Sequence, residues 1–246
     1  MLPTEPVPLL VFDLDGTILR INSFPRWTLY LLVGRIPGLG PRRRVKLSLA
    51  TLLLVITRKL GRISHVELQR HLQVVAGPFR AGTTARFRDS LLRHLRPNLH
   101  TLLQMVQHRE VAAILATAAC AEYAEDLGRQ LGFSHIAATR SNRSPGEPSN
   151  SGEEKRREVR RIRTAAGWSD QPMILFTDHI DDLPLIRDSS LVCWFGSTKM
   201  LRKAASLVEG VQFIDCRSIN SVDLDAILRF PRNTATYTLL SPMTMS

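Results

Sequence analysis

The sequence predicts an α/β fold in which a doubly wound parallel sheet carries a helical insertion after its first strand. Short apolar runs of strand length occur at residues 9–12, 111–116, 173–176 and 191–195. Segments with helical periodicity separate most of these runs, and this alternation is typical of parallel strands joined by crossover helices. The stretch 23–103, between the first two runs, is helical and basic. These three observations together predict the fold class.

Each element has a local signal of its own. The first strand, 9–12, runs into acidic and glycine residues, as a buried parallel strand does when it delivers a functional loop. Ser64 and Glu67 have the spacing of a capping box, so a helix is expected to begin at Ser64. Weaker strands at 135–137 and 212–214 would complete the sheet. Further helices are expected over residues 27–33, 45–60, 83–95, 99–108, 123–131 and 153–166.

The composition is that of a globular protein with an unusual positive charge. The 246 residues are 44% hydrophobic and 22% charged, and the formal net charge of +11 favours anionic partners. Cys120, Cys193 and Cys216 form no CxxC pair, so we expect neither a disulfide framework nor a zinc site. We recognise no secretory signal and no apolar run of about 18 residues. These features indicate a cytoplasmic protein.

Acidic residues follow two of the predicted strands. Asp13 and Asp15 come directly after the first strand, and Asp178, Asp181 and Asp182 follow a later one. Because ligands of such sheets bind at the carboxyl ends of the strands, we expect these side chains to meet at one edge. Carboxylates that lie close together repel one another unless they are protonated or bind a cation, and Mg²⁺ suits an all-oxygen site. A single Asp-x-Asp pair could equally be a loop or helix cap.

The order of the acidic motifs resembles a known family. The sequence Asp-Leu-Asp-Gly-Thr, which begins at Asp13, resembles the first signature of the haloacid dehalogenase superfamily. Thr117 is similar to the hydroxyl residue of the second motif, and Lys155 to the lysine of the third. Asp178 and Asp182 resemble the paired acids of the fourth motif. The surrounding Asp-His-x-x-Asp-Leu-Pro string resembles the phosphoserine-phosphatase-like branch, in which a helical cap follows the first motif.

The resemblance implies a Rossmann-like sheet and a Mg²⁺-dependent phosphomonoester hydrolase. Asp13 would be the nucleophile that forms an aspartyl-phosphate, and Asp15 the general acid and base. The resemblance places Mg²⁺ between Asp13, the backbone carbonyl of Asp15 and Asp178, with Asp182 in support. Family members that are dehalogenases or ion-pumping ATPases lack the second aspartate, so Asp15 favours phosphatase or mutase chemistry.

The resemblance also assigns the phosphate-binding residues. Thr117 and Lys155 would bind the phosphoryl oxygens, and Lys155 would neutralise charge on Asp13. Two neighbours of the fourth motif are expected to be structural: Asp181 to face solvent, and His179 to be a loop residue hydrogen-bonded to backbone. Two alternatives stay open, a phosphotransferase or mutase of the same superfamily and a catalytically silent basic module that binds anions or membranes.

A helical cap would determine specificity, because a cap that closes over the site excludes water and contacts the substrate. Arg20, Asn22 and Arg26 enter this cap close to the nucleophile and are the candidates for substrate contact. The expected parts are a discontinuous catalytic core (1–22 and 104–230), a helical cap (23–103) and a poorly ordered tail (231–246).

The expected partner is a small phosphorylated substrate. Basic residues flank the apolar segment 47–56, which we interpret mainly as the core of the cap. The alternative is a peripheral contact of the cap with an anionic membrane surface. Nucleic acid is not an expected partner, since the chain has no recognition motif and no aromatic platform. The sequence carries no signature of a particular oligomeric state.

Overall fold

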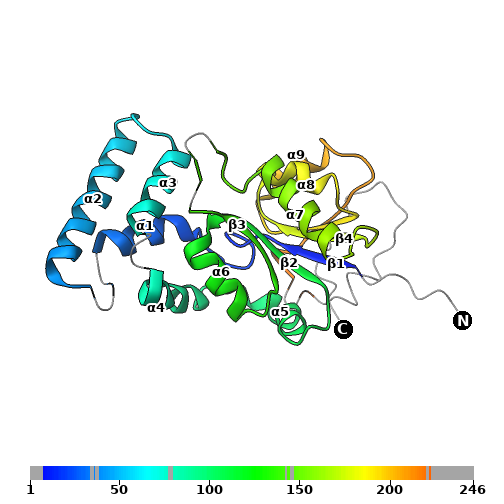
Figure 1. Cartoon of the computed structure of the whole chain (residues 1–246). Coiled ribbons are helices and arrows are strands. Elements are labelled where there is room, and N and C mark those ends of the chain that lie inside the picture. The colour runs from blue at the N-terminus through cyan, green and yellow to red at the C-terminus, as the bar shows by residue number, and fades with distance from the viewer. Residues whose placement is uncertain are drawn as a thin grey trace, which may run out of the picture.

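The computed structural model describes residues 8–33, 36, 39–76, 80–141, 143–144, 147–219 and 222, without the side chains of residues 80–83. The described residues form one sheet of six parallel strands in the order β3-β2-β1-β4-β5-β6 (Figure 1). The strands are β1 (Leu9–Phe12), β2 (Ala113–Cys120), β3 (His135–Thr139), β4 (Met173–Thr177), β5 (Leu191–Trp194) and β6 (Gln212–Asp215). This confirms the doubly wound, Rossmann-like α/β fold. The predicted tail lies outside the described residues.

The strand order reverses direction beside β1, at its boundary with β4. Phe12 at the end of β1 is in register with Phe176 of β4 on one side and with Leu115 of β2 on the other. The rings of Phe12 and Phe176 stack with centroids 4.2 Å apart. Because the ends of β1 and β4 lie level, the acidic residues that follow them emerge side by side at the switch point where such sheets bind ligands.

Helices cover both faces of the sheet because its central strands are apolar on both sides. Leu10 and Phe12 of β1 pack in the cluster that includes the buried faces of α5 and α6, whereas Leu9 and Val11 pack in the cluster of α7, α8 and α9. This alternation is the two-residue period of a strand. The bounds of these helices are α5 (His100–Gln107), α6 (Ala121–Gln130), α7 (Glu153–Ala165), α8 (Leu183–Ile186) and α9 (Thr198–Ala205). Short 3₁₀ turns occupy Pro97–Leu99 (η2) and Ile180–Asp182 (η3).

Four of the five α-helices described between β1 and β2 form a layer beyond one end of the sheet (Figure 1). They are α1 (Ser23–Val33), α2 (Pro41–Lys59), α3 (His65–Ala76) and α4 (Arg80–Leu92), and we call them the helical insertion. The predicted capping box is present: Glu67 N donates to Ser64 Oγ at 3.1 Å, and Ser64 N donates to Glu67 Oε2 at 2.6 Å. The division at residue 103 stays a prediction, although α5 already packs on the sheet.

The two connections of the insertion to the sheet run side by side. Leu19 and Leu95 form an antiparallel bridge. Arg20 N donates to His94 O at 2.9 Å, and Arg96 N donates to Ile18 O at 2.8 Å. The insertion therefore leaves the sheet and returns to it through one narrow neck, formed by residues 18–20 and 94–96.

Two details differ from the sequence predictions. The strand expected at 111–116 is shifted and extends to Cys120, because the alanine-rich segment after Ala116 continues beside β3 with a shift in register. The apolar segment of α2 is not mainly core. Leu47 is buried, but Leu49 and Leu53 are exposed, since α2 contacts α1 and α3 through one side only. Among the described helices, none combines the length and hydropathy that crossing a bilayer requires.

Candidate active site

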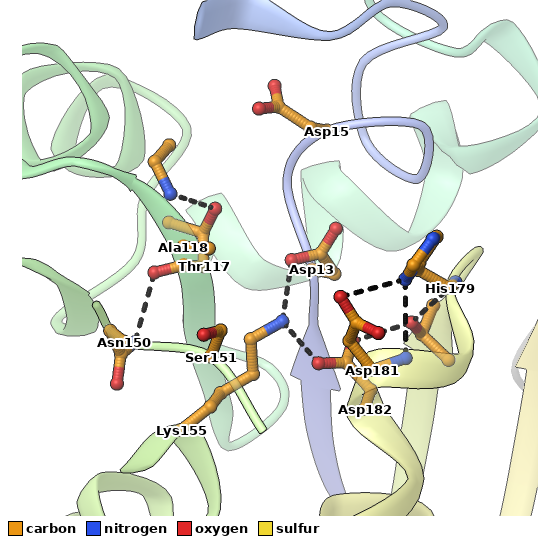
Figure 2. Close-up of polar contacts among 12 residues, drawn as sticks. Asp13, Asp15, Thr117, Ala118, Asn150, Ser151, Lys155, His179, Asp181 and Asp182 are labelled. Atoms are coloured by element: carbon orange, nitrogen blue, oxygen red, sulfur yellow. Dashed lines mark hydrogen bonds and ion pairs between the residues drawn. The ribbon is translucent and has the colours of Figure 1, made fainter. Parts of the chain in front are cut away.

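A buried contact between a lysine and an aspartate lies at the centre of the acidic edge. Asp13 directly follows β1, and its backbone N donates to Phe176 O of β4 at 2.9 Å. Lys155, in the first turn of α7, places its Nζ 2.8 Å from Asp13 Oδ1 (Figure 2). The lysine is only 3% exposed and Asp13 only 8%. A charged group at this depth has few waters to stabilise it, so other polar groups must hold the lysine.

Asp182 provides that support. Its Oδ1 lies 2.7 Å from Lys155 Nζ, and its Oδ2 accepts a 2.6 Å hydrogen bond from Thr177 Oγ1. Burial lowers the pKa of Lys155, but the Asp13 and Asp182 carboxylates outweigh it and raise that pKa above its ordinary range. Lys155 is therefore a fixed cation between two aspartates, and both Asp182 oxygens are already engaged.

Asp13 carries more negative charge around it than one lysine compensates. Burial raises the pKa of its carboxyl to about 8, with further increases from Asp182 and Asp178 that the Lys155 cation opposes. The pKa of Asp178 is also raised, first by burial and then by Asp182. Crowded carboxylates with raised pKa values are typical of a site that binds a cation.

The Asp178 side chain reaches across to the loop that follows β1. A Cβ built on Gly16 would lie 2.0 Å from Asp178 Oδ2, so the carboxylate rests against the glycine backbone. Gly16 has φ +75°, a conformation that glycine adopts readily. No group of three or more His, Cys, Asp or Glu side chains within the described ranges forms a ready ligand cluster. The carboxylates of Asp13 and Asp178 lie close enough to raise the pKa of Asp13, and such oxygen donors suit a hard cation.

Asp15 is bound by the start of the helical insertion. Ser23 donates to its carboxylate twice, from the backbone N at 2.9 Å and from Oγ at 3.0 Å. The Ser23 hydroxyl also forms a 2.8 Å hydrogen bond with Tyr123 OH of α6. Burial raises the pKa of Asp15 to about 6, and the two Ser23 hydrogen bonds limit the rise. A carboxyl with this pKa exchanges a proton readily near neutral pH.

Thr117 lies at the same edge, in the irregular part of β2. It is buried, and its Oγ1 accepts a hydrogen bond from Ala119 N at 3.1 Å, a contact that does not use the hydroxyl hydrogen. Asn150 Nδ2 donates to Thr117 O at 3.0 Å and to Ala137 O at 2.9 Å, which ties the loop before α7 to β2 and β3 (Figure 2). The structure thus brings Asp13, Lys155 and Thr117 to one edge of the sheet.

The insertion docks on this edge through two buried glutamines of α3. Gln69 Nε2 donates to Ala118 O at 2.8 Å. Gln73 Nε2 donates to Thr139 O at 2.9 Å and to Glu122 Oε2 at 3.0 Å. The side chain of Arg96, in the neck, donates to the carbonyls of Gly16 and Thr17 in the loop after β1.

The remaining predicted residues lie at the periphery. Arg20, Asn22 and Arg26 are exposed, and Asn22 Oδ1 accepts a hydrogen bond from Phe24 N at the start of α1. Their contact with a substrate stays a prediction. His179 Nδ1 accepts from Asp181 N at 3.2 Å, and the Asp181 side chain is 71% exposed. The predicted placements of these two residues are confirmed, and a purely structural role stays a prediction.

Several contacts of the site could not be found from motifs. Ser23 carried a weak signal, since serine is common where a helix starts, and here it is the first residue of α1. Four others depend on segments that meet only after folding: Gln69, Gln73, Arg96 and Asn150. Thr177 donates to Asp182, five residues further along the chain, and no motif indicated this contact.

Comparison with known proteins identifies the family of the chain and solved structures that share its fold. The haloacid dehalogenase-like hydrolase family model matches residues 10–187. A protein with unknown function from Bordetella pertussis Tohama I superposes with a TM-score of 0.63 at 18% identity, covering 86% of this chain and 99% of that one. A probable phosphoserine phosphatase from Vibrio cholerae gives 0.55 at 12% identity, covering 90% and 65%. A phosphoserine phosphatase solved as a phospho-aspartyl intermediate analogue gives 0.53 at 12%, covering 92% and 99%. No curated protein sequence is significantly similar.

At these identities the solved structures show a shared α/β fold. The family model matches most of the sequence, from within β1 to the end of α8, and it includes all four predicted motifs. The chain belongs to the haloacid dehalogenase-like hydrolase family.

Proposed function

We propose that the protein is a Mg²⁺-dependent phosphomonoester hydrolase whose nucleophile is Asp13. The observation that carries the proposal is the 2.8 Å contact between Asp13 and the buried Lys155 at the sheet edge where Asp178 also lies. A buried lysine beside a nucleophilic carboxylate supplies positive charge for an incoming dianionic phosphate. Family membership supports hydrolase chemistry, and Asp15 favours a phosphoryl group as the target.

The donors that would hold Mg²⁺ are the carboxylates of Asp13 and Asp178 and the backbone carbonyl of Asp15. When bound, the ion would offset the repulsion between an anionic nucleophile and an anionic phosphate. Asp182 would act indirectly, because Lys155 and Thr177 already engage its two oxygens. Gly16 leaves room for Asp178 at this place.

In the first step, a carboxylate oxygen of Asp13 attacks phosphorus and forms the bond of an aspartyl-phosphate while the bond to the leaving oxygen breaks. Asp15 donates its proton to that leaving oxygen. Thr117 Oγ and Lys155 Nζ bind the phosphoryl oxygens and hold the group in line. Ser23 keeps the Asp15 carboxyl in place through its two hydrogen bonds.

In the second step, Asp15 takes a proton from a water molecule, whose oxygen attacks phosphorus. The bond between phosphorus and Asp13 breaks, inorganic phosphate leaves, and Asp15 is protonated again for the next cycle. The pKa of about 6 allows Asp15 to serve in both directions.

The helical insertion would act as the cap that closes this site. The buried contacts of Gln69 and Gln73 with the sheet edge support a closed arrangement. We propose a small phosphorylated compound as the substrate, with Arg20, Asn22 and Arg26 as candidate contacts. The three cysteines are free and buried, which supports a reducing cytoplasmic setting.

The proposal is tested by replacing Asp13 with Asn and assaying release of inorganic phosphate from p-nitrophenyl phosphate with Mg²⁺. Asp13→Asn removes the nucleophile, so activity should fall to background. Asp181→Asn is the matched control in the same region, and it should keep wild-type activity because Asp181 faces solvent. Borohydride trapping of the phosphorylated aspartate should label wild-type protein and not the Asp13→Asn variant. Full activity of Asp13→Asn would refute the assignment.

A phosphotransferase or mutase shares the first step and differs in the acceptor. If a hydroxyl acceptor takes the phosphoryl group in place of water, product should form with no matching release of inorganic phosphate. Measuring both products in one reaction separates the two activities.

A further inference from the structure

The outer helix of the insertion exposes a continuous apolar stripe. It consists of Val45, Leu49, Leu52, Leu53, Ile56 and Leu60, whose exposures lie between 42% and 65%. Their spacing places them on one side of α2 and of the turn that follows it. Monomeric soluble proteins rarely expose apolar patches of this kind without a partner.

The stripe is not the face by which α2 packs. Leu47 and Thr51, the buried residues of α2, lie on the opposite side, and the helix contacts α1 and α3. Figure 1 shows α2 at the outer end of the molecule, on the far side of the insertion from the sheet. In the part of the chain that the structure describes, the stripe therefore faces outward.

The charges of α2 identify the kind of surface. The helix contains no acidic residue, and its cationic residues cluster at its two ends. Arg42, Arg43, Arg44 and Lys46 lie in the first turns, and Arg58 and Lys59 in the last. An apolar stripe with cationic residues at each end is the pattern of a helix that lies in the interface of an anionic bilayer.

We infer that α2 binds the surface of an anionic lipid bilayer, with the stripe inserted among the acyl chains and the basic residues on the headgroups. A second copy of the chain is a poorer occupant, because pairing two such stripes would bring arginine-rich helices together. The inference is independent of the proposed hydrolase activity.

Vesicle flotation tests the inference. Wild-type protein should float with vesicles of equimolar phosphatidylglycerol and phosphatidylcholine and not with phosphatidylcholine alone, and salt should weaken binding. Leu49→Gln/Leu53→Gln should reduce binding by roughly tenfold or more. Arg43→Gln/Arg44→Gln should reduce it by roughly fivefold for each charge removed.

Two matched variants control for generic effects of the substitutions. Leu207→Gln changes an exposed leucine outside the helical insertion. Arg202→Gln/Lys203→Gln removes two exposed cations from α9. Both variants should bind vesicles as wild type does. Hydrolysis of a soluble phosphomonoester by the α2 variants should be unchanged, which separates this inference from the proposed function. The inference fails if wild type does not float, or if Leu49→Gln/Leu53→Gln floats equally well. It also fails if light scattering without lipid shows a dimer that this variant converts to a monomer.

Discussion

Gly16 occupies the point where the two acidic motifs meet. Its φ of +75° and the 2.0 Å separation between a Cβ at this position and Asp178 Oδ2 impose two distinct requirements. One is conformational, because a side chain disfavours the left-handed region. The other is steric, because a methyl group would displace the Asp178 carboxylate. Gly61 shares the first requirement, with φ +72°, and has nothing within 4 Å of its Cβ position.

Substituting each of these two glycines separates an effect on stability from an effect on activity. Gly16→Ala and Gly61→Ala should each lower the free energy of unfolding by about 1–2 kcal/mol from the backbone conformation. Only Gly16→Ala should also lower kcat/KM, by about a hundredfold, because it moves a group of the active site. Denaturant unfolding and a phosphatase assay measure the two effects. Equal loss of activity in both variants would remove the proposed role of Gly16.

At the scale of elements, α3 holds the insertion against the sheet through polar contacts inside a buried interface. Gln73 is fully buried, and its amide satisfies the carbonyl of Thr139 at the end of β3. Removing a buried donor leaves its acceptor unsatisfied, which costs more than the net value of the hydrogen bond.

We therefore expect Gln73→Leu to lower the free energy of unfolding by about 1–3 kcal/mol. Gln104→Leu is the matched control, since Gln104 is exposed on α5, and it should change stability by less than about 0.5 kcal/mol. Urea unfolding followed by circular dichroism measures both values. A change in Gln73→Leu no larger than that of the control would show that the α3 contact does not stabilise the molecule.

At the scale of the whole molecule, the carboxylate edge links folding to pH. The native pKa of Asp13, about 8, lies well above that of an aspartate in an unfolded chain, and Asp178 is shifted in the same direction. Between the two pKa values of Asp13, the unfolded chain has lost a proton that the native protein retains. The stability of the metal-free protein should therefore fall as pH rises through this window.

Mg²⁺ should reverse this trend, because it binds the ionised carboxylates and competes with their protons. We expect the increase in Tm on adding Mg²⁺ to be larger near pH 8 than near pH 6, because at pH 6 a larger fraction of Asp13 is protonated and Mg²⁺ must displace that proton. Thermal unfolding with and without Mg²⁺ measures the difference. Asp13→Asn should show a smaller Mg²⁺ effect, and a wild-type effect independent of pH would contradict the prediction.

Strands, helices and motifs could be predicted from the sequence because they depend on residues close together in the chain. Contacts between distant segments could not, because they depend on how the chain packs. The acids after β1 and β4 were identifiable because strand order and motif place them at one edge. The contact of Arg96 with the loop after β1 was not predicted, since it forms only when the insertion returns to the sheet. The contact of Ser23 with Asp15 spans only eight residues, but it depends on how the backbone turns between them. Periodicity showed that α2 is apolar, but not which side would be buried.

The neck formed by residues 18–20 and 94–96 limits where the helical insertion can change during evolution. Its two segments, residues 18–20 and 94–96, are hydrogen-bonded to each other. These bonds fix the backbone positions at which the insertion begins and ends. Helix α2, which packs on α1 and α3, could be lengthened, shortened or exchanged without shifting β1 or its acidic loop, while Ser23 of α1 and the glutamines of α3 keep their contacts with the site. The outer part of the insertion can thus change during evolution and alter substrate specificity or localisation. The residues that cleave the phosphate ester would stay unchanged.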